Sequence, residues 1–141
     1  MKTILDDYRE VSLVVVTEDI NEFYCKVVPM KVGAQNRIVE DDSGIILEIK
    51  FGLVSGYLVV PEIIQVGLNL QCTDSFALSE VINSSMLDSL GFSVLQKANK
   101  HIVLKTSHQY VNVFLDSDET ETMGELVTVK RILNSRAAVS T

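Results

Sequence analysis

The chain has 141 residues, of which 47% are hydrophobic and 22% charged, and its formal net charge is −7. This length suits one domain, and the apolar share is high enough to offset the entropy of ordering the chain, which argues against intrinsic disorder. The negative charge disfavours nucleic acid as a partner, because phosphate contacts dominate nucleic-acid affinity.

The first part of the chain predicts a short helix and two strands. Residues 4–8 have apolar side chains at a helical spacing, with Thr3 as the cap. Residues 11–17 and 22–28 are strands by composition, and their short connection predicts an antiparallel pair. Residues 33–43 form either a loop or a brief edge strand at Ile38-Val39.

Residues 44–60 predict a central hairpin around which the chain is organised. Two runs rich in β-branched and aromatic residues flank a short segment with Gly52, Ser55 and Gly56, which supplies the backbone freedom of a reversal. Pro61 ends the second strand, since proline cannot donate to a ladder.

Residues 62–71 predict a further, half-buried strand, in which alternate apolar residues face inward and Gln65 and Gly67 face outward. After Thr73 the hydrophobic period changes to that of a helix, which we expect to end at Gly91. The residues on its apolar face are Leu78, Val81, Ile82, Met86 and Leu90.

The remaining chain predicts three strands and a last helix. The strands are expected at 92–96, 101–105 and 110–115. Thr122 and Glu125 have the spacing of a capping box and open the helix. Its expected apolar stripe is Met123, Leu126, Val129, Ile132 and Leu133.

These elements predict the α+β class in one domain, residues 1–141. An antiparallel β-rich N-terminal half of about five strands is followed by an α-β-β-β-α unit. The change of pattern allows a subdivision into residues 1–72, residues 73–136 and a tail at 137–141.

Few residues suggest a metal-binding, cofactor-binding or catalytic role. His101 and His108 are the only histidines, and the predicted strands keep them apart, so we expect no metal site. Asp41 and Asp42 are adjacent loop carboxylates, which are expected to be solvated and to point apart. The acidic run at 116–121 lacks the pattern of a calcium loop and places favourable charge before the last helix. The two cysteines, Cys25 and Cys72, are expected to be buried, and no motif indicates a cofactor or a catalytic residue.

One small basic cluster stands out in the C-terminal half. Lys97, Lys100, His101 and Lys105 lie on and beside a predicted turn, where an anion or RNA would be met.

The order of the elements around this turn is similar to that of a known protein family. Residues 86–105, which include a Gly-Phe pair after the predicted helix, are followed by the strand at 110–115 and by a helix containing Gly124. Over residues 76–136 this order resembles HicA-type toxins, which implies a double-stranded-RNA-binding-like fold and cleavage of messenger RNA.

The chain differs from this family at the family's catalytic segment. The Gly-Ser-His segment of the family falls on Ala98-Asn99-Lys100, and His101 follows one place later, so the catalytic histidine is not matched. The resemblance therefore implies a shared topology rather than a shared reaction.

The sequence favours a non-catalytic interaction or assembly subunit, because sheet edges and apolar faces are plentiful and reactive groups are not gathered. We expect a protein partner or self-association, as a homo-oligomer or a component of a larger particle such as a phage virion. The alternative is an RNA-binding or HicA-like ribonuclease domain that uses the turn at 97–101. No signal peptide or apolar run of membrane-spanning length is visible, so the expected location is the cytoplasm, or the virion of a phage.

Overall fold

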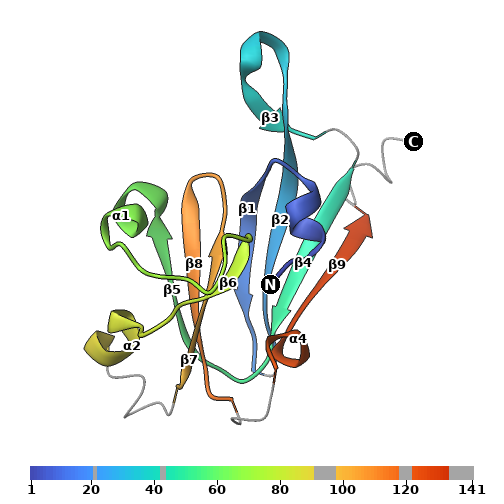
Figure 1. The fold of residues 1–141 in the computed structure, drawn as a ribbon. Helices are drawn as coiled ribbons and strands as arrows, with labels where there is room; N and C mark the ends of the chain where they lie inside the picture. The colour runs from blue at the N-terminus through green and yellow to red at the C-terminus, as the bar shows by residue number, and fades with distance from the viewer. Residues whose placement is uncertain (21, 42–43, 91–97, 118–121, 134–141) are drawn as a thin grey trace.

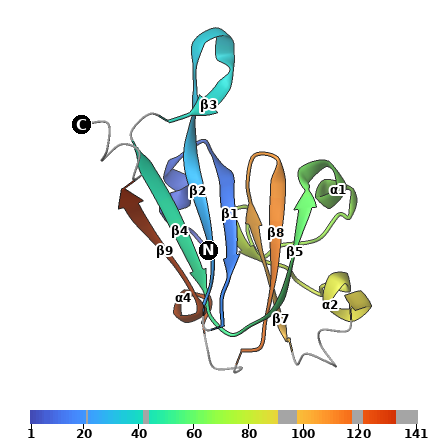
Figure 2. The same ribbon diagram turned by 180° about the vertical axis from the view of Figure 1, so that it is seen from behind.

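A computed structural model describes residues 1–20, 22–41, 44–90, 98–117 and 122–133. The chain forms two antiparallel sheets, which lie on opposite sides of the molecule in Figures 1 and 2. The predicted α+β class with a β-rich N-terminal half is confirmed.

The first sheet has five strands, four of which follow the order β1-β2-β4-β9, with β3 paired to β2. Its strands are β1 (Glu10–Glu18), β2 (Phe23–Val32), β3 (Ile38–Glu40), β4 (Ile45–Phe51) and β9 (Val127–Leu133). The predicted antiparallel pairing of the first two strands is confirmed. The end of β2 and β3 form an arm that projects from the body (Figures 1 and 2).

The second sheet has four strands in the order β5-β8-β7-β6. They are β5 (Val54–Pro61), β8 (Gln109–Leu115), β7 (Lys100–Lys105) and β6 (Leu78–Glu80). The predicted strands at 101–105 and 110–115 are confirmed as β7 and β8, which pair with each other.

The helices are short. They are the 3-10 turns η1 (Ile4–Asp7) and η2 (Ala34–Asn36) and the α-helices α1 (Glu62–Gly67), α2 (Ser85–Leu90) and α4 (Met123–Leu126). Thr3 caps η1, as predicted, and its hydroxyl accepts from the Leu5 amide at 3.1 Å.

The inward faces of both sheets supply one hydrophobic core. Alternate residues of β2 and β4 from the first sheet and of β7 and β8 from the second sheet point into it, as the period of a strand requires. Its fully buried members include Cys25, Val27, Leu47, Ile49, Leu78, Ile102, Leu104, Val111, Val113 and Leu115.

The predicted central hairpin is wrong, although both of its strands exist. β4 pairs with β2 and β9, whereas β5 pairs with β8 in the other sheet. A two-residue hairpin turn of type I′ needs positive φ at both positions, and in the pair Gly52-Leu53 only Leu53 has it, at 57°. The Gly52 amide instead donates to the Leu126 carbonyl at 2.7 Å, so the chain passes from one sheet to the other.

The predicted strand at 62–71 is also wrong, because its first residues form α1. The expected orientation is reversed as well. Gln65 is buried, while Ile64 and Val66 are exposed.

The helix expected from Leu78 is wrong in its first half. Leu78 lies on β6 opposite Leu104 and faces the core. Asn83 has a φ of 49°, a left-handed conformation that interrupts any continuous helix, so α2 begins only at Ser85.

The last predicted helix ends after one turn. The capping box is confirmed, with the Thr122 amide donating to Glu125 Oε2 at 2.9 Å. After Leu126 the chain becomes β9, whose β-branched residues pair with the open edge of β4. The expected stop at Gly91, strand at 92–96, acidic residues at 118–121 and tail at 137–141 lie outside the described residues.

The two halves of the sequence exchange strands. β5 from residues 1–72 joins the second sheet, and β9 from residues 73–136 joins the first. The sequential α-β-β-β-α order is therefore not the arrangement of the described residues.

Candidate functional site

The outward face of the second sheet carries a buried cluster of polar side chains. Within β7 and β8, His101 pairs with Phe114 and Val103 with Asn112, so His101 and Asn112 share this face. Gln65 reaches it from α1, and Ser84 reaches it from the residue before α2. These four residues, which we call the polar cluster, are each at most 6% exposed.

The members of the polar cluster are hydrogen-bonded in a continuous chain. Ser84 Oγ lies 2.6 Å from His101 Nδ1, and His101 Nε2 lies 2.7 Å from Asn112 Oδ1. Asn112 and Gln65 exchange two further bonds between their amides, of 3.0 and 2.9 Å. Two segments that are far apart in the sequence, α1 and the residue before α2, are thereby tied to one sheet face.

One backbone carbonyl sets the direction of the whole chain. Asn112 Nδ2 donates to the Leu58 carbonyl at 3.3 Å, so Asn112 Oδ1 is the acceptor toward the imidazole. His101 Nε2 must then carry the proton, and Nδ1 holds the lone pair. It follows that the Ser84 hydroxyl donates to Nδ1.

The surroundings of His101 keep its imidazole neutral. Burial lowers the pKa of His101 below its usual range, and the hydrogen bond with Asn112 only partly offsets this effect. Phe114 packs against the ring, with 4.7 Å between centroids. No carboxylate forms a hydrogen bond to His101 among the described residues, so no opposite charge there compensates for the burial of the imidazole.

The predicted basic turn does not form one exposed surface. His101 is 1% exposed and both of its ring nitrogens are hydrogen-bonded, which corrects its expected role as a contact for an anion or RNA. Lys100 and Lys105 are half-buried at opposite ends of β7. Lys97 lies outside the described residues.

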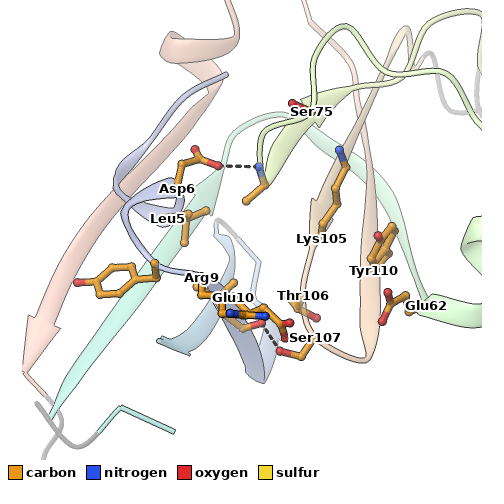
Figure 3. A pocket seen from close by; sticks show the side chains of 13 residues that line it. Leu5, Asp6, Arg9, Glu10, Glu62, Ser75, Lys105, Thr106, Ser107 and Tyr110 are labelled. Atoms are coloured by element: carbon orange, nitrogen blue, oxygen red, sulfur yellow. Dashed lines mark hydrogen bonds between the residues drawn. The ribbon is translucent and has the colours of Figure 1, made fainter. Parts of the chain in front are cut away.

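Lys105 borders a separate hollow of about 330 Å³ between the N-terminal segment and the second sheet. Figure 3 shows its lining, in which Asp6 points toward the backbone of Ala77 and Ser107 toward β1. Lys105 Nζ donates to Ser79 Oγ at 3.4 Å, and Asp6 accepts from the Ala77 amide at 2.9 Å. The bonds of Asp6 and Ser107 join the N-terminal segment and β1 to the second sheet, whereas the bond of Lys105 lies within that sheet.

A second feature is an exposed apolar surface. The helix α1 buries Gln65 and turns its apolar residues outward, with Ile63 85% exposed. Leu58 on β5 pairs with Asn112, the partner of Gln65, and is exposed beside this helix. We call the following set the α1 surface: Leu58, Ile63, Ile64, Val66 and Leu68.

Other site types find no support in the part of the chain that the structure describes. No group of three or more His, Cys, Asp and Glu side chains there is placed to hold a metal ion. Cys25 is buried, as expected, and burial raises the pKa of its thiol to about 12, while Cys72 is only half-buried. None of the described helices has the length and apolar character needed to cross a membrane.

Comparison with protein families, curated protein sequences and solved structures finds no match to this chain.

Sequence reasoning identified one member of the polar cluster, His101, and assigned it to the surface. It missed Gln65, Ser84 and Asn112. A signal was present for two of them, because Asn112 interrupts an apolar strand and Gln65 interrupts an apolar run, and a buried polar residue needs a partner.

Proposed function

We propose that this protein is an assembly subunit that binds a second copy of itself through the α1 surface and the edge of β5. The observation that carries the proposal is the inverted helix α1, which buries its glutamine and exposes its isoleucines and valine. Burying a large apolar side chain stabilises a complex by about 1.5–3 kcal/mol, so a contiguous exposed group of them marks an interaction site.

Charge supports a second copy as the occupant. A net charge of −7 makes two copies repel each other, so they associate most easily where charge is absent. Between Lys50 and Asp74 the chain holds a single charged residue, Glu62. The segment that forms β5 and α1 is thus the surface on which two acidic copies meet with least repulsion.

Strand geometry supports the same occupant. Among the described residues, β5 has β8 as its only strand neighbour, which makes it an edge strand of the second sheet. The strand carries none of the charged residues that usually protect an edge. Antiparallel pairing of β5 with its copy across a two-fold axis would join the two second sheets and bring both α1 surfaces into one interface.

The test is the mass of the protein in solution, measured by size-exclusion chromatography with light scattering. We expect the wild type to be a dimer or larger, and the double variant I63E/I64E to be a monomer with an unchanged circular dichroism spectrum. The matched control is I20E, because Ile20 is 95% exposed in the turn after β1, away from α1. A monomeric wild type, or a double variant with the wild-type mass, would contradict the proposal.

We do not extend the proposal to RNA. The histidine of the predicted turn lies in the interior, and its described lysines are half-buried and separated by the length of β7. Membership of a larger particle, such as a virion, would require a second contact besides the two-fold one, and a mass above two copies would indicate it.

A further inference from the structure

A hollow of about 660 Å³ lies beside the polar cluster. Ser84 is the member of the cluster that borders it, whereas His101 and Asn112 lie behind Ser84. The side chains around the hollow include Val81, Ile82, Asn83 and Leu87. Ser84 thus stands between a space that admits a small molecule and a chain of buried hydrogen bonds.

One hydrogen bond of Ser84 has the direction that an activated serine needs, since the hydroxyl proton points to the lone pair of His101 Nδ1. The serine oxygen also accepts from the Leu87 amide at 3.2 Å, the N-cap bond of α2, which holds Ser84 in place beside the imidazole. Asn112 holds the opposite ring nitrogen and so fixes the tautomer of the imidazole. A nucleophile, a neutral base and a side chain that orients the base are therefore in line.

We propose that Ser84 is a nucleophile, with His101 as its general base and Asn112 as a positioning residue, and that the protein hydrolyses small acyl esters in this hollow. This activity is independent of the self-association proposed above, because none of its residues belongs to the α1 surface.

The reaction proceeds in two balanced steps. Ser84 Oγ forms a bond to the acyl carbon while its proton moves to His101 Nδ1, and the ester C–O bond breaks as that proton passes to the departing alcohol. Water then gives a proton to Nδ1 as its oxygen adds to the acyl carbon. The bond to Ser84 breaks, Oγ takes the proton back, and a carboxylic acid is released.

The carboxylates among the described residues around the hollow favour one class of substrate. Glu80 and Asp88 border it, and no lysine or arginine does so among the described residues. Carboxylate lining repels anions, so we expect neutral or cationic acyl esters rather than acids or phosphates.

The experiment uses an alkyl fluorophosphonate as the probe. A reactive serine displaces fluoride and keeps the phosphonyl group, which intact-protein mass spectrometry detects and peptide mapping locates. We expect one adduct, on Ser84, and none in S84A. The control is S85A, since Ser85 is exposed, adjacent in sequence and outside the proposed machinery, and it should label at the wild-type rate.

Two further measurements separate a chemical role from a structural one. In H101Q we expect labelling to slow by roughly 100-fold or more, as loss of a general base predicts. In the wild type the labelling rate should fall in acid, where His101 becomes protonated. Absence of an adduct on Ser84 in the wild type, or equal rates in H101Q and the wild type, would overturn the proposal. Neither result depends on whether S84A folds.

Discussion

At the scale of single residues, the polar cluster explains why a strand with a buried face contains an asparagine. Asn112 is fully buried and bonds to His101, Gln65 and the Leu58 carbonyl. Hydrogen bonds of this kind add little net stability when formed, but a buried donor or acceptor left without its partner costs about 1–3 kcal/mol.

We therefore expect N112A to lower the free energy of unfolding by about 3 kcal/mol, because it leaves both the His101 Nε2 proton and the Gln65 amide without their hydrogen-bond partner. Urea denaturation measures this as a lower midpoint with an unchanged slope. The control Q71A changes an exposed side chain and should stay within about 0.5 kcal/mol of the wild type. A loss in N112A no larger than in Q71A would show that the cluster is not needed for stability.

His101 predicts a dependence of stability on pH. Its pKa in the folded protein lies below the value of about 6.5 for an exposed imidazole, so the unfolded chain binds more protons between these two values. The free energy of unfolding should therefore fall as the pH drops through about 6.5, and this contribution should stop falling below the folded pKa. Urea denaturation between about pH 7.5 and 5.5 measures the slope, which should be smaller in H101Q. Equal slopes in both proteins would contradict the account of a buried neutral imidazole.

At the scale of elements, the crossing from β4 to β5 decides the fold. Leu53 adopts a φ of 57°, which costs a residue with a Cβ about 1–2 kcal/mol relative to glycine. The Asp116 amide donates to its carbonyl at 2.8 Å and helps to hold this conformation.

Replacing Leu53 by glycine should consequently stabilise the protein by about 0.5 kcal/mol, since relief of the left-handed backbone outweighs the added flexibility of the unfolded chain. The matched control is V14G, because Val14 on β1 is 54% exposed and Leu53 is 53% exposed. The midpoint temperature of thermal unfolding should be higher in L53G than in the wild type and lower in V14G than in the wild type. A lower midpoint temperature in L53G than in the wild type would argue against strain at this crossing.

Local signals in the sequence predicted the secondary-structure elements better than they predicted which strands pair with each other. The strands at β1, β2, β4, β5, β7 and β8 followed from composition, and both capping residues, Thr3 and Thr122, followed from their side chains. The partners of β4 and β5 did not follow from composition. The two strands are adjacent in sequence, but they lie in separate sheets because their partners β9 and β8 lie far along the chain.

The same limit explains the errors at α1 and β9. Gln65 faces inward only because Asn112, on a strand much later in the sequence, provides its amide. Residues after Leu126 leave a helical pattern because the edge of β4 is open to them. The polar cluster was not predictable as a site, since its members come from four separate segments.

At the scale of the whole molecule, the exchange of β5 and β9 between the sheets makes the two sequence halves depend on each other. We expect one cooperative unfolding transition by calorimetry and circular dichroism, and no cooperative transition in separate fragments 1–72 and 73–141. A fragment that unfolds cooperatively on its own would show that the halves are independent units.

The α1 surface is the feature of the whole molecule on which the proposed assembly depends. Hydrogen exchange followed by mass spectrometry tests it most directly, comparing the wild type with I63E/I64E at the same concentration. We predict that the amides of β5 exchange more slowly in the wild type than in the variant, while those of β1, an edge strand of the other sheet, exchange equally in both. Equal exchange of β5 in the two proteins would contradict self-association through this edge.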